Sequence, residues 1–411
     1  MEVAVTLHLA ESTSEDMSAR GVAVAAGFCP IRLRRIKAVM GRWVDDGAIP
    51  GFSAVVSRGG RTVLDLTMGL QDPITGAAMR PDSVFRIYSM TKPIVSAAAM
   101  ALVEAGRMKL TDPVTDYLPA FADLEVLIDP DDDALRTEKA VRPIRIIDLF
   151  RHTAGFTHGV FGATPLDAAY RRAGIPDEEA TNAELVARLA RLPLKHQPQT
   201  VWEYGRSTDV LGHLLEVVSG APLSLVLQHT LLGPLGMVDT GFHAPADRVV
   251  EPFPDDHELA ELPYIDVSRP PRFEAAGEGL VSTPRDYARF CQMILNGGVL
   301  GGERVLGRKT VELMLTDVVG DFFDRGTWWL PGDGHGFSLG FGIRRPGPRT
   351  STVIAPLLGS EGECFWAGNA GTYFWIDPRE RLTGVFMMQS CRHLLRAIDQ
   401  FKTLVLQAIV D

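Results

Sequence analysis

The sequence contains little cysteine and no cysteine cluster. The four cysteines, Cys29, Cys291, Cys364 and Cys391, are scattered over 411 residues, and none stands in a Cys-x-x-Cys pair or beside grouped histidines. This spacing argues against a disulfide scaffold and against a structural zinc site. We therefore interpret these thiols as reduced side chains with a structural role.

Long apolar runs and basic runs are also missing. No apolar stretch reaches the roughly 18 residues of a membrane-spanning helix, and the N-terminus lacks the basic start of a secretory signal. The formal net charge of −10 disfavours binding to nucleic acid or to anionic lipid. We expect a cytoplasmic protein, monomeric or homodimeric, that contacts neither, with residues 1–28 as an N-terminal tail.

Metal and nucleotide motifs are absent as well. His152 and His158 stand six residues apart, and Asp255-Asp256-His257 lies in a proline-rich stretch, so neither group has convergent ligand spacing. No P-loop occurs, and no Gly-x-Gly-x-x-Gly turn occurs in a βαβ frame. We expect no metal and no cofactor.

What the sequence does contain is a clear change of apolar pattern along the chain. Helical spacing marks residues 31–46, two β-rich runs at 52–57 and 62–67 flank a Gly-Gly turn, and the small apolar stretch 89–106 predicts a buried helix. Later helical patterns fall at 185–192, 210–218, 284–296 and 397–409, and strand patterns at 340–343, 364–366, 372–376 and 384–389. We predict a sheet domain built from residues 29–88 and 275–411, with a mostly helical domain, 89–274, inserted.

A candidate nucleophile opens the buried helix, in Ser89-Met90-Thr91-Lys92. Residues three apart on a helix are neighbours, and the free N–H groups at a helix start favour negative charge. A buried lysine loses hydration and can then take a proton from a serine. The apolar stretch after Lys92 would supply that burial. The alternative is an N-capping serine beside an ordinary surface lysine.

The surroundings of this tetrad resemble the serine β-lactamase and penicillin-binding superfamily, and more narrowly class C β-lactamases and the family VIII carboxylesterases of the same fold. The matching segments are residues 85–93, 110–114, 149–155, 235–237, 239–241, 279–286 and 371–378. The resemblance implies an α+β fold, in which an antiparallel sheet flanked by helices joins the inserted helical domain. It places the active site between the two domains, with Ser89 as nucleophile.

The second motif of that family, Tyr-x-Asn, falls on Tyr204-Gly205-Arg206. The resemblance implies that the Tyr204 phenol shares a proton with Lys92 and Ser89. Arg206 replaces an asparagine that in the family helps to hold the amide arm of the substrate, which puts amide recognition in doubt. Without the resemblance, Tyr204 would be interpreted as a core aromatic residue.

The third motif, Lys-Thr-Gly, falls on Trp366-Ala367-Gly368. A tryptophan cannot pair with the carboxylate of a β-lactam and instead offers a broad apolar wall, unless it merely fills the core. Gly368 would let the substrate approach the backbone closely. By analogy with the family, the backbone N–H groups of Ser89 and Asn369 would form the oxyanion hole.

A rival serine motif, Gly-x-Ser-x-Gly, occurs at residues 336–340. Asp377 and His393 follow Ser338 in the chain order of an α/β-hydrolase triad. That motif requires a strand before the serine and a helix after it, and neither flanking stretch has such a pattern. We predict that residues 336–340 only lead into a strand.

These residues together predict a serine carboxylesterase that cleaves short-chain or aromatic esters through an acyl-enzyme on Ser89. Its partner would be a small-molecule ester, contacted by Trp366, Gly368, Arg206 and Tyr88. A weak β-lactamase, a D-amino-acid peptidase or an acyltransferase on the same scaffold is an alternative. A second alternative is a protein that binds β-lactam-like or peptidoglycan ligands without turnover.

Overall fold

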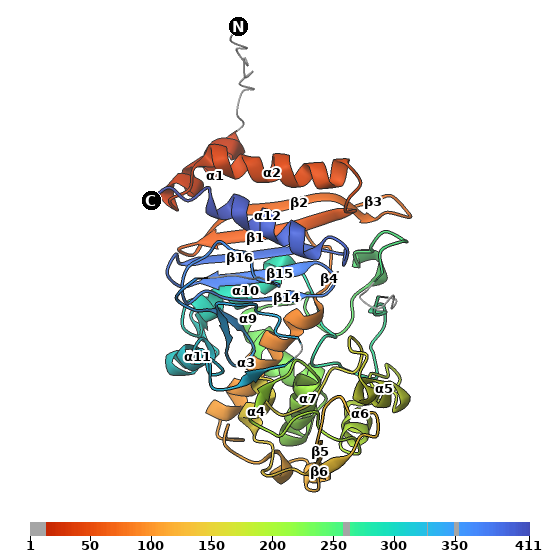
Figure 1. Ribbon diagram of the computed structural model, residues 1–411. Helices are drawn as coiled ribbons and strands as arrows, with labels where there is room; N and C mark the ends of the chain where they lie inside the picture. The colour runs from red at the N-terminus through yellow and green to blue at the C-terminus, as the bar shows by residue number, and fades with distance from the viewer. Residues whose placement is uncertain (1–13, 258–263, 327, 349–352) are drawn as a thin grey trace.

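A large antiparallel sheet forms the upper part of the molecule in Figure 1. The computed structural model describes residues 14–257, 264–326, 328–348 and 353–411, and within them eight strands form this sheet in the order β12-β13-β14-β15-β16-β1-β2-β3. The strands are β1 Gly51–Arg58, β2 Arg61–Asp72, β3 Ala77–Ala78, β12 His335–Phe337, β13 Gly342–Arg344, β14 Cys364–Gly368, β15 Thr372–Asp377 and β16 Leu382–Met388. The two ends of the chain therefore build one sheet, joined where Val55 of β1 pairs with Val385 of β16.

The predicted hairpin and strands are confirmed, with changed ends. Strands β1 and β2 meet at a turn in which Gly59 and Gly60 have φ of 57° and 75°, values that glycine adopts without a steric penalty. β1 is buried along almost its whole length because it lies inside the sheet with helices on both faces. The short strand β12 was not predicted, because three residues carry too little periodicity.

Helices cover both faces of the sheet (Figure 1). On one face α2, Pro30–Asp45, packs against α12, Leu394–Leu406, and α1, Ser14–Ala25, contacts α2. On the other face α10, Pro284–Leu295, contacts β1, β15 and β16. The helices predicted at 31–46 and 284–296 are confirmed, and α12 begins three residues before its predicted start.

The middle of the chain is mostly helical and lies below the sheet in Figure 1. Its helices are α3 Thr91–Glu104, α4 Ile146–Phe150, α5 Pro165–Arg172, α6 Asn182–Leu189, α7 Ser207–Ser219, α8 Leu223–Leu227 and α9 Gly233–Leu235, with α11 Arg308–Met314 further on. Every residue from Thr91 to Met100 is buried, which confirms the predicted burial of α3. The domain boundaries proposed from the sequence stay a prediction.

Short strand pairs and single turns connect these helices. The pairs are β4 Phe85–Arg86 with β8 Val281–Ser282, β5 Glu125–Leu127 with β6 Thr137–Lys139, β7 Val201–Trp202 with β11 Asp324–Arg325, and β9 Val299–Leu300 with β10 Glu303–Arg304. The turns are η1 Tyr88–Met90, η2 Val114–Asp116, η3 Pro119–Phe121, η4 Gln228–Leu232 and η5 Ala246–Arg248. In the described part of the chain, no single helix is long and apolar enough to cross a membrane, although the pair Ser207–Ser219 and Leu223–Leu235, bent by 79°, meets that test jointly.

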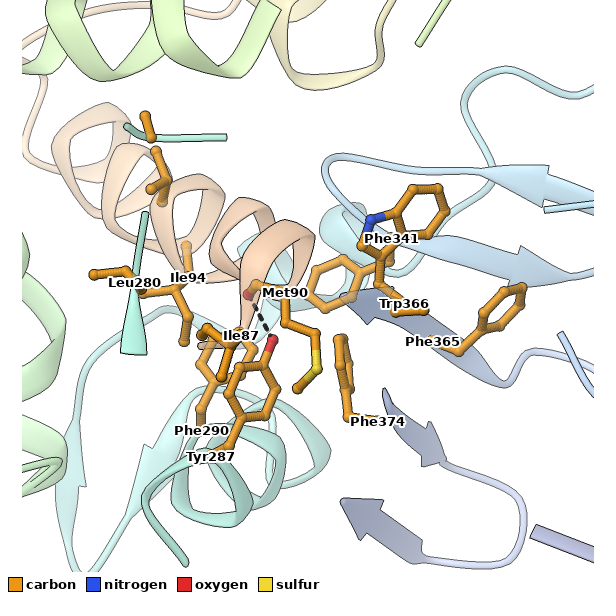
Figure 2. Close-up of a cluster of buried hydrophobic side chains, with 14 of the residues drawn as sticks. Ile87, Met90, Ile94, Leu280, Tyr287, Phe290, Phe341, Phe365, Trp366 and Phe374 are labelled. Carbon is orange, nitrogen blue, oxygen red and sulfur yellow. Dashed lines mark hydrogen bonds between the residues drawn. The ribbon is translucent and has the colours of Figure 1, made fainter. Parts of the chain in front are cut away.

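An apolar cluster supports the turn that carries Ser89. Figure 2 shows Ile87, Met90 and Ile94 facing aromatic side chains from α10 and the sheet. The hydroxyl of Tyr287 donates a hydrogen bond of 2.9 Å to the Met90 carbonyl. Burial of one such side chain stabilises the fold by about 1.5–3 kcal/mol, so this contact area holds η1 firmly against the sheet.

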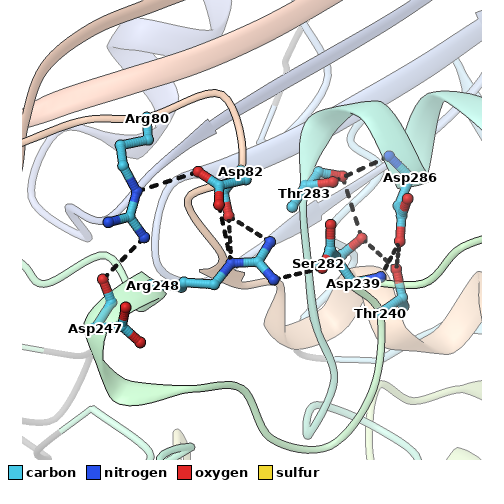
Figure 3. A network of polar contacts seen from close by, with 9 residues as sticks. All are labelled: Arg80, Asp82, Asp239, Thr240, Asp247, Arg248, Ser282, Thr283 and Asp286. Atoms are coloured by element: carbon cyan, nitrogen blue, oxygen red, sulfur yellow. Dashed lines mark hydrogen bonds and ion pairs between the residues drawn. The ribbon is translucent and has the colours of Figure 1, made fainter.

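A polar network ties together two of the segments that carry the family resemblance, 239–241 and 279–286 (Figure 3). The Asp286 carboxylate accepts hydrogen bonds from Asp239 N–H at 2.8 Å and from the Thr240 hydroxyl at 3.0 Å. Arg248 then forms ion pairs with Asp239 at 2.7 Å and with Asp82 at 3.4 Å. The network lies beside the β4–β8 pair, so it helps to position the chain just before Ser89.

Candidate active site

Ser89 and Lys92 meet where η1 runs into α3. The Lys92 ammonium nitrogen, Nζ, lies 3.1 Å from Ser89 Oγ and donates a hydrogen bond to it. Lys92 is only 3% exposed, because the residues after it are apolar and α3 crosses the interior. The predicted proximity of the two side chains is therefore present in the structure.

The backbone before Ser89 is strained. Tyr88 has a φ of 42°, a region that costs a residue with a side chain on the order of 1–3 kcal/mol. The Tyr88 hydroxyl accepts a hydrogen bond of 3.2 Å from the Ile265 N–H, and its ring packs edge-on against Tyr264. These contacts, together with the Tyr287–Met90 hydrogen bond, hold the strained turn that presents Ser89.

Tyr204 approaches the same serine from the loop between β7 and α7. Its hydroxyl donates a hydrogen bond of 2.7 Å to Ser89 Oγ, and Lys92 Nζ lies 4.6 Å from its ring centroid. The rings of Trp202 and His158 each lie 6.0 Å from the Tyr204 ring at 19° to its plane. Tyr204 is 4% exposed, and the packing of its ring keeps the hydroxyl pointing toward Ser89.

Lys92 has a second partner, which the sequence did not reveal. Its Nζ donates a hydrogen bond of 2.7 Å to the carbonyl of Gly277, 185 residues away. The Gly277 N–H in turn donates to Asp209 Oδ1 at 2.8 Å. The two backbone groups of Gly277 thus link Lys92 to Asp209, and the carbonyl holds the lysine ammonium group beside Ser89.

Arg206 is part of this buried charge cluster. Its Nη1 lies 3.3 Å from Asp209 and 2.8 Å from Glu278. Burial opposes ionisation of Glu278, but Arg206 and further positive neighbours, Lys92 among them, together outweigh it and lower the pKa of Glu278 to about 2. Burial raises the pKa of Asp209, against the opposing pull of Arg206. The cluster therefore places an ionised carboxylate, Glu278, near Lys92.

Two histidines stand close to Tyr204 and stay neutral. Burial lowers the pKa of His152 and of His158 well below the ordinary range, and positive charge at Lys92 and Arg206 adds to the effect. The His152 ring centroid lies 4.9 Å from that of Tyr204. In the described part of the chain, no three His, Cys, Asp or Glu side chains are grouped to hold a metal ion.

Strand β14 forms the opposite wall of the site. A Cβ on Gly368 would lie 2.2 Å from the Ile87 carbonyl oxygen and 2.3 Å from Thr372 Oγ1, so only glycine lets β14 approach the turn before Ser89 this closely. Asn369 follows directly, and both residues line the cavity that contains Ser89. The oxyanion hole proposed for the N–H groups of Ser89 and Asn369 stays a prediction.

That cavity measures about 670 Å³. Trp366 and Tyr204 line it, and the Trp366 ring packs 5.8 Å from Tyr204 and 5.2 Å from Phe337. The rest of its lining is largely apolar, from Phe161, Trp328, Leu330, Val353, Ile354, Leu394 and Leu395. Trp366 therefore packs into the core and at the same time forms one wall of the space beside Ser89.

Tyr88 and Arg206, which we expected to contact the substrate, lie outside the lining of the Ser89 cavity. Among the described residues, those lining the Ser89 cavity do not include Tyr88 or Arg206. Tyr88 lines a neighbouring cavity instead. Arg206 is almost fully buried and donates to the His158 carbonyl as well as pairing with two carboxylates. Arg206 therefore holds Asp209 and Glu278 near Lys92 and does not line the Ser89 cavity.

The rival serine lies in a tight turn. Ser338 follows β12, is fully buried, and its N–H and hydroxyl both donate to the Phe341 carbonyl, at 2.8 and 3.3 Å. The chain then enters β13, so no helix follows the serine, in agreement with our rejection of the α/β-hydrolase motif. Residues 336–340 form the end of β12 and the turn into β13, a correction to the simple strand entry that we predicted.

Several residues of the site escaped the sequence analysis. Gly277 and Glu278 directly precede the matched segment 279–286, but nothing in their type or spacing pointed to Lys92. Asp209 had a signal, because it stands three residues after Arg206 at the start of a predicted helix, the spacing of an ion pair. His158 was weighed only as a metal ligand.

Comparison with known proteins identifies the family. A family model described as Beta-lactamase matches residues 34–398. The chain belongs to the β-lactamase family. With this assignment and the fold described above, it is a serine hydrolase of the β-lactamase and penicillin-binding superfamily.

Individual relatives of this hydrolase include esterases. It is 35% identical over 364 residues to Protein Rv1367c of Mycobacterium tuberculosis (strain H37Rv), which covers 85% of this chain and 88% of that protein. It is 33% identical over 227 residues, 54% of each chain, to Esterase EstB of Burkholderia gladioli. The solved structure of EstCE1, described as a hydrolase with promiscuous acyltransferase activity, has the same fold, with a TM-score of 0.74, 24% identity and coverage of 97% of this chain and 100% of that chain.

Proposed function

We propose that this hydrolase is a serine carboxylesterase of the family VIII type, acting on short-chain or aromatic esters. The observation that carries the proposal is the position of Ser89 Oγ, between Lys92 at 3.1 Å and Tyr204 at 2.7 Å, in a cavity with a wall of Trp366. A serine hydroxyl with two potential proton partners beside an apolar cavity suits acyl transfer from a neutral ester.

The proposed reaction has two steps. In the reactive form one proton has left the Lys92–Tyr204 pair, so this pair can take up the proton of Ser89 as its Oγ bonds to the ester carbonyl carbon. The N–H groups of Ser89 and Asn369 bind the resulting oxyanion. The C–O bond to the alcohol then breaks, the alcohol leaves with the proton, and the acyl group stays on Ser89. A water molecule attacks this acyl-enzyme in the same way and releases the acid and the free serine.

Two features favour esters over β-lactams. Trp366 stands where the family has the lysine of Lys-Thr-Gly, and its ring offers contact area but no charge for a carboxylate. EstB, a relative of this chain, is named an esterase. Charged groups are present only at the edge of the apolar cavity, as Arg392 and Arg396 among its described lining residues.

Acyl transfer to an alcohol is a second candidate activity. The printed description of EstCE1 includes promiscuous acyltransferase activity, and the apolar cavity of this chain would hold a second alcohol beside the acyl-enzyme. Transfer and hydrolysis share every step up to the acyl-enzyme, so product analysis in the presence of an added alcohol distinguishes them.

The test is nitrophenyl butyrate hydrolysis combined with intact-mass analysis after a fluorophosphonate probe. We expect one covalent adduct on the wild-type chain and none on Ser89→Ala, with kcat/KM of the variant reduced by about 10⁴-fold or more. Tyr204→Phe, which keeps the ring, should lose about 10²–10⁴-fold. Tyr373→Phe is the matched control, because that buried hydroxyl has no hydrogen-bond partner among the described residues.

Contrary outcomes are clear. Full activity in Ser89→Ala, or abolished activity in folded Ser338→Ala, would refute the assignment of the nucleophile. Absence of any adduct would favour a binding protein without turnover. A higher kcat/KM on a cephalosporin than on the butyrate ester would favour a β-lactamase.

A further inference from the structure

A second, smaller cavity borders the catalytic residues and measures about 260 Å³. Tyr88, which lines it, directly precedes Ser89, and Phe161 lines both this cavity and the large one. The ring of His158, another lining residue, lies parallel to that of Tyr204 at 6.0 Å, and the Tyr204 hydroxyl binds Ser89. The two cavities are therefore neighbours that share the Phe161 side chain.

The charged residues that line this small cavity are acidic. They are Glu178, Asp266 and Glu278, and no lysine or arginine stands among its described lining residues. Glu278 is ionised at neutral pH, since its pKa is about 2, and hydrogen bonds from Ser268 lower the pKa of Asp266. Burial keeps the pKa of His158 well below its ordinary range, so this ring adds no positive charge. An anionic group would therefore be repelled from the cavity.

Two arginines outside the lining compensate part of this negative charge. Arg206 lies 2.8 Å from Glu278, and Arg269 lies 3.6 Å from Asp266. Each of these arginines also faces a second carboxyl group, at 3.3 and 4.0 Å respectively. The positive charge of each guanidinium is therefore shared between the cavity and another part of the protein.

Lys92 and Arg86 also act on the cavity from outside its lining. Lys92 contributes to the low pKa of Glu278, and Arg86 contributes to that of Asp266. Arg86 already forms an ion pair with a further carboxylate at 3.1 Å. Glu178 is exposed, and it forms no ion pair with another described residue. The cavity therefore keeps an excess of negative charge.

The walls of the small cavity are aromatic. The rings come from Tyr88, Phe161, Phe242 and Phe273. The face of an aromatic ring attracts a cation, and quaternary ammonium groups are bound in this way. Asp266 Oδ1 already accepts hydrogen bonds from Ser268, and Glu278 Oε1 accepts one from Arg206. A cation that brings no N–H donors therefore suits the ring faces and the surrounding charge.

We infer that this small cavity is a substrate subsite that binds a quaternary ammonium group on one limb of the ester. The inference rests on the proposed esterase function and narrows its substrate class to cationic esters. An ester has two limbs, one on each side of its carbonyl group, and two cavities that share Phe161 can hold one limb each. The carboxylates and the ring faces attract the cation more strongly than a neutral group of the same shape.

The experiment compares esters that differ only in a trimethylammonium or a tert-butyl group, which have the same shape. The nitrophenyl ester of γ-trimethylammoniobutyric acid and its tert-butyl analogue place the difference on the acyl limb. Choline butyrate and its tert-butyl analogue place it on the alcohol limb. Each kcat/KM is divided by the rate of hydroxide-catalysed hydrolysis of the same ester, because the charge also changes its intrinsic reactivity. We expect the cation to be favoured about tenfold in at least one pair, and that pair identifies the limb.

The variant Glu178→Gln removes one lining charge at an exposed position. The ratio of trimethylammonium to tert-butyl ester should fall about two- to threefold, because an exposed charge acts through solvent, and Asp266→Asn in the same chain should lower it further. Phe273→Leu keeps an apolar wall but removes one ring face, so the ratio should fall about twofold. Glu179→Gln is the matched control, because this neighbouring side chain is 75% exposed and is not among the described lining residues of either cavity. It should leave the ratio unchanged.

The outcomes separate this inference from the proposed function. Plain esters hydrolysed through Ser89 with no preference for the cation in either pair would overturn the subsite and leave the esterase intact. A preference for the tert-butyl ester in both pairs would also overturn it, since the cavity would then be selecting apolar groups. Equal effects of Glu178→Gln and Glu179→Gln on the ratio would overturn it too, because the attraction would not come from the cavity. No hydrolysis of any ester would remove both proposals.

Discussion

The two cavities beside Ser89 are walled by different parts of the fold and carry opposite charge. The larger one lies against β14 and the start of α12, and its charged lining residues among those described are Arg392 and Arg396. The smaller one lies among loops of the helical part, and its charged lining residues are Glu178, Asp266 and Glu278. Ser89 thus lines an apolar, weakly positive space, and the residue before it, Tyr88, lines an aromatic, acidic one.

The difference shows how each wall is stabilised. The wall of the large cavity belongs to a hydrogen-bonded sheet, where Trp366 pairs with Phe374 of the next strand and burial of its ring costs no desolvated charge. The wall of the small cavity contains a carboxylate, Glu278, that is only 17% exposed and is stabilised by Arg206 at 2.8 Å. Substitutions in the wall of the large cavity, on the sheet side, should therefore lower the catalytic rate. Substitutions in the wall of the small cavity, on the helical side, should lower the free energy of unfolding.

The largest effect is expected from Gly368→Ala, on the sheet side. The added Cβ would lie 2.2 Å from the Ile87 carbonyl oxygen, so β14 and the turn before Ser89 must move apart. That movement would take the Asn369 N–H away from the oxyanion, and kcat should fall by about 10²–10³-fold, as for the loss of one oxyanion donor. Steady-state hydrolysis of nitrophenyl butyrate measures it.

The control for this change is Gly21→Ala in α1. No atom lies within 4 Å of a Cβ built there, so activity should stay within about twofold while helix propensity improves slightly. If Gly368→Ala keeps full kcat with unchanged KM, strand β14 has no part in stabilising the transition state, and the proposed role of Asn369 fails.

The sequence predicted the secondary structure of the site better than its long-range contacts. Burial of α3 followed from the near-absence of polar residues after Lys92, and the β1–β2 hairpin followed from two β-rich runs around Gly59 and Gly60. Both signals are local, because each depends on residues that are close together in the sequence, within one helix or one hairpin. Helix and strand types were therefore right even where their ends shifted by a few residues.

Contacts between distant segments could not be predicted in the same way. The contact between Tyr204 and Ser89 could be predicted only from the family resemblance, because 115 residues separate the two. The Gly277 carbonyl, which holds Lys92, has no side chain to signal its role. The motif position of Arg206 implied a substrate contact, and its ion pairs with Asp209 and Glu278 could not be predicted, because these residues come together only in the folded chain.

A stability effect of intermediate size is expected from Glu278→Gln, on the helical side. Removing one partner of a buried ion pair leaves Arg206 undercompensated and should cost about 3 kcal/mol of unfolding free energy at neutral pH. Because Arg206, with Lys92 and other positive neighbours, lowers the pKa of Glu278 from 4.5 to about 2, the stability advantage of the wild-type chain is complete above pH 4.5. It should disappear as the pH falls toward 2, since Glu278 is then protonated.

Urea unfolding at several pH values provides the measurement, with Glu251→Gln as the control. Glu251 pairs with Arg86 at 3.1 Å, but its side chain is 40% exposed, so its loss should cost less than about 1 kcal/mol. If the two variants lose equal unfolding free energy at neutral pH, burial does not make the Arg206–Glu278 pair more stabilising than the exposed Arg86–Glu251 pair. A cost for Glu278→Gln that persists unchanged at low pH would contradict the charge-based explanation.

The smallest effect is expected from Arg396→Gln, at the edge of the large cavity. This exposed side chain lies over the Trp43 ring at 5.5 Å, and within the described residues it forms no ion pair with a carboxylate. It is therefore free to attract an anionic substrate, whereas Arg392 is paired with Asp255 at 3.3 Å. We expect kcat/KM for a nitrophenyl hemiester of glutaric acid to fall by about two- to threefold, because an exposed charge acts through solvent.

The same variant should leave neutral nitrophenyl butyrate unchanged, and the loss on the hemiester should shrink as salt shortens the screening length below about 8 Å. Arg285→Gln is the control, an exposed arginine on α10 that is paired with Asp65 and lines neither cavity. An equal loss on the neutral ester would mean that Arg396 acts by packing on Trp43. The positive edge of the large cavity would then be incidental, and the opposite charge of the two cavities would rest on Glu278 and its neighbours alone.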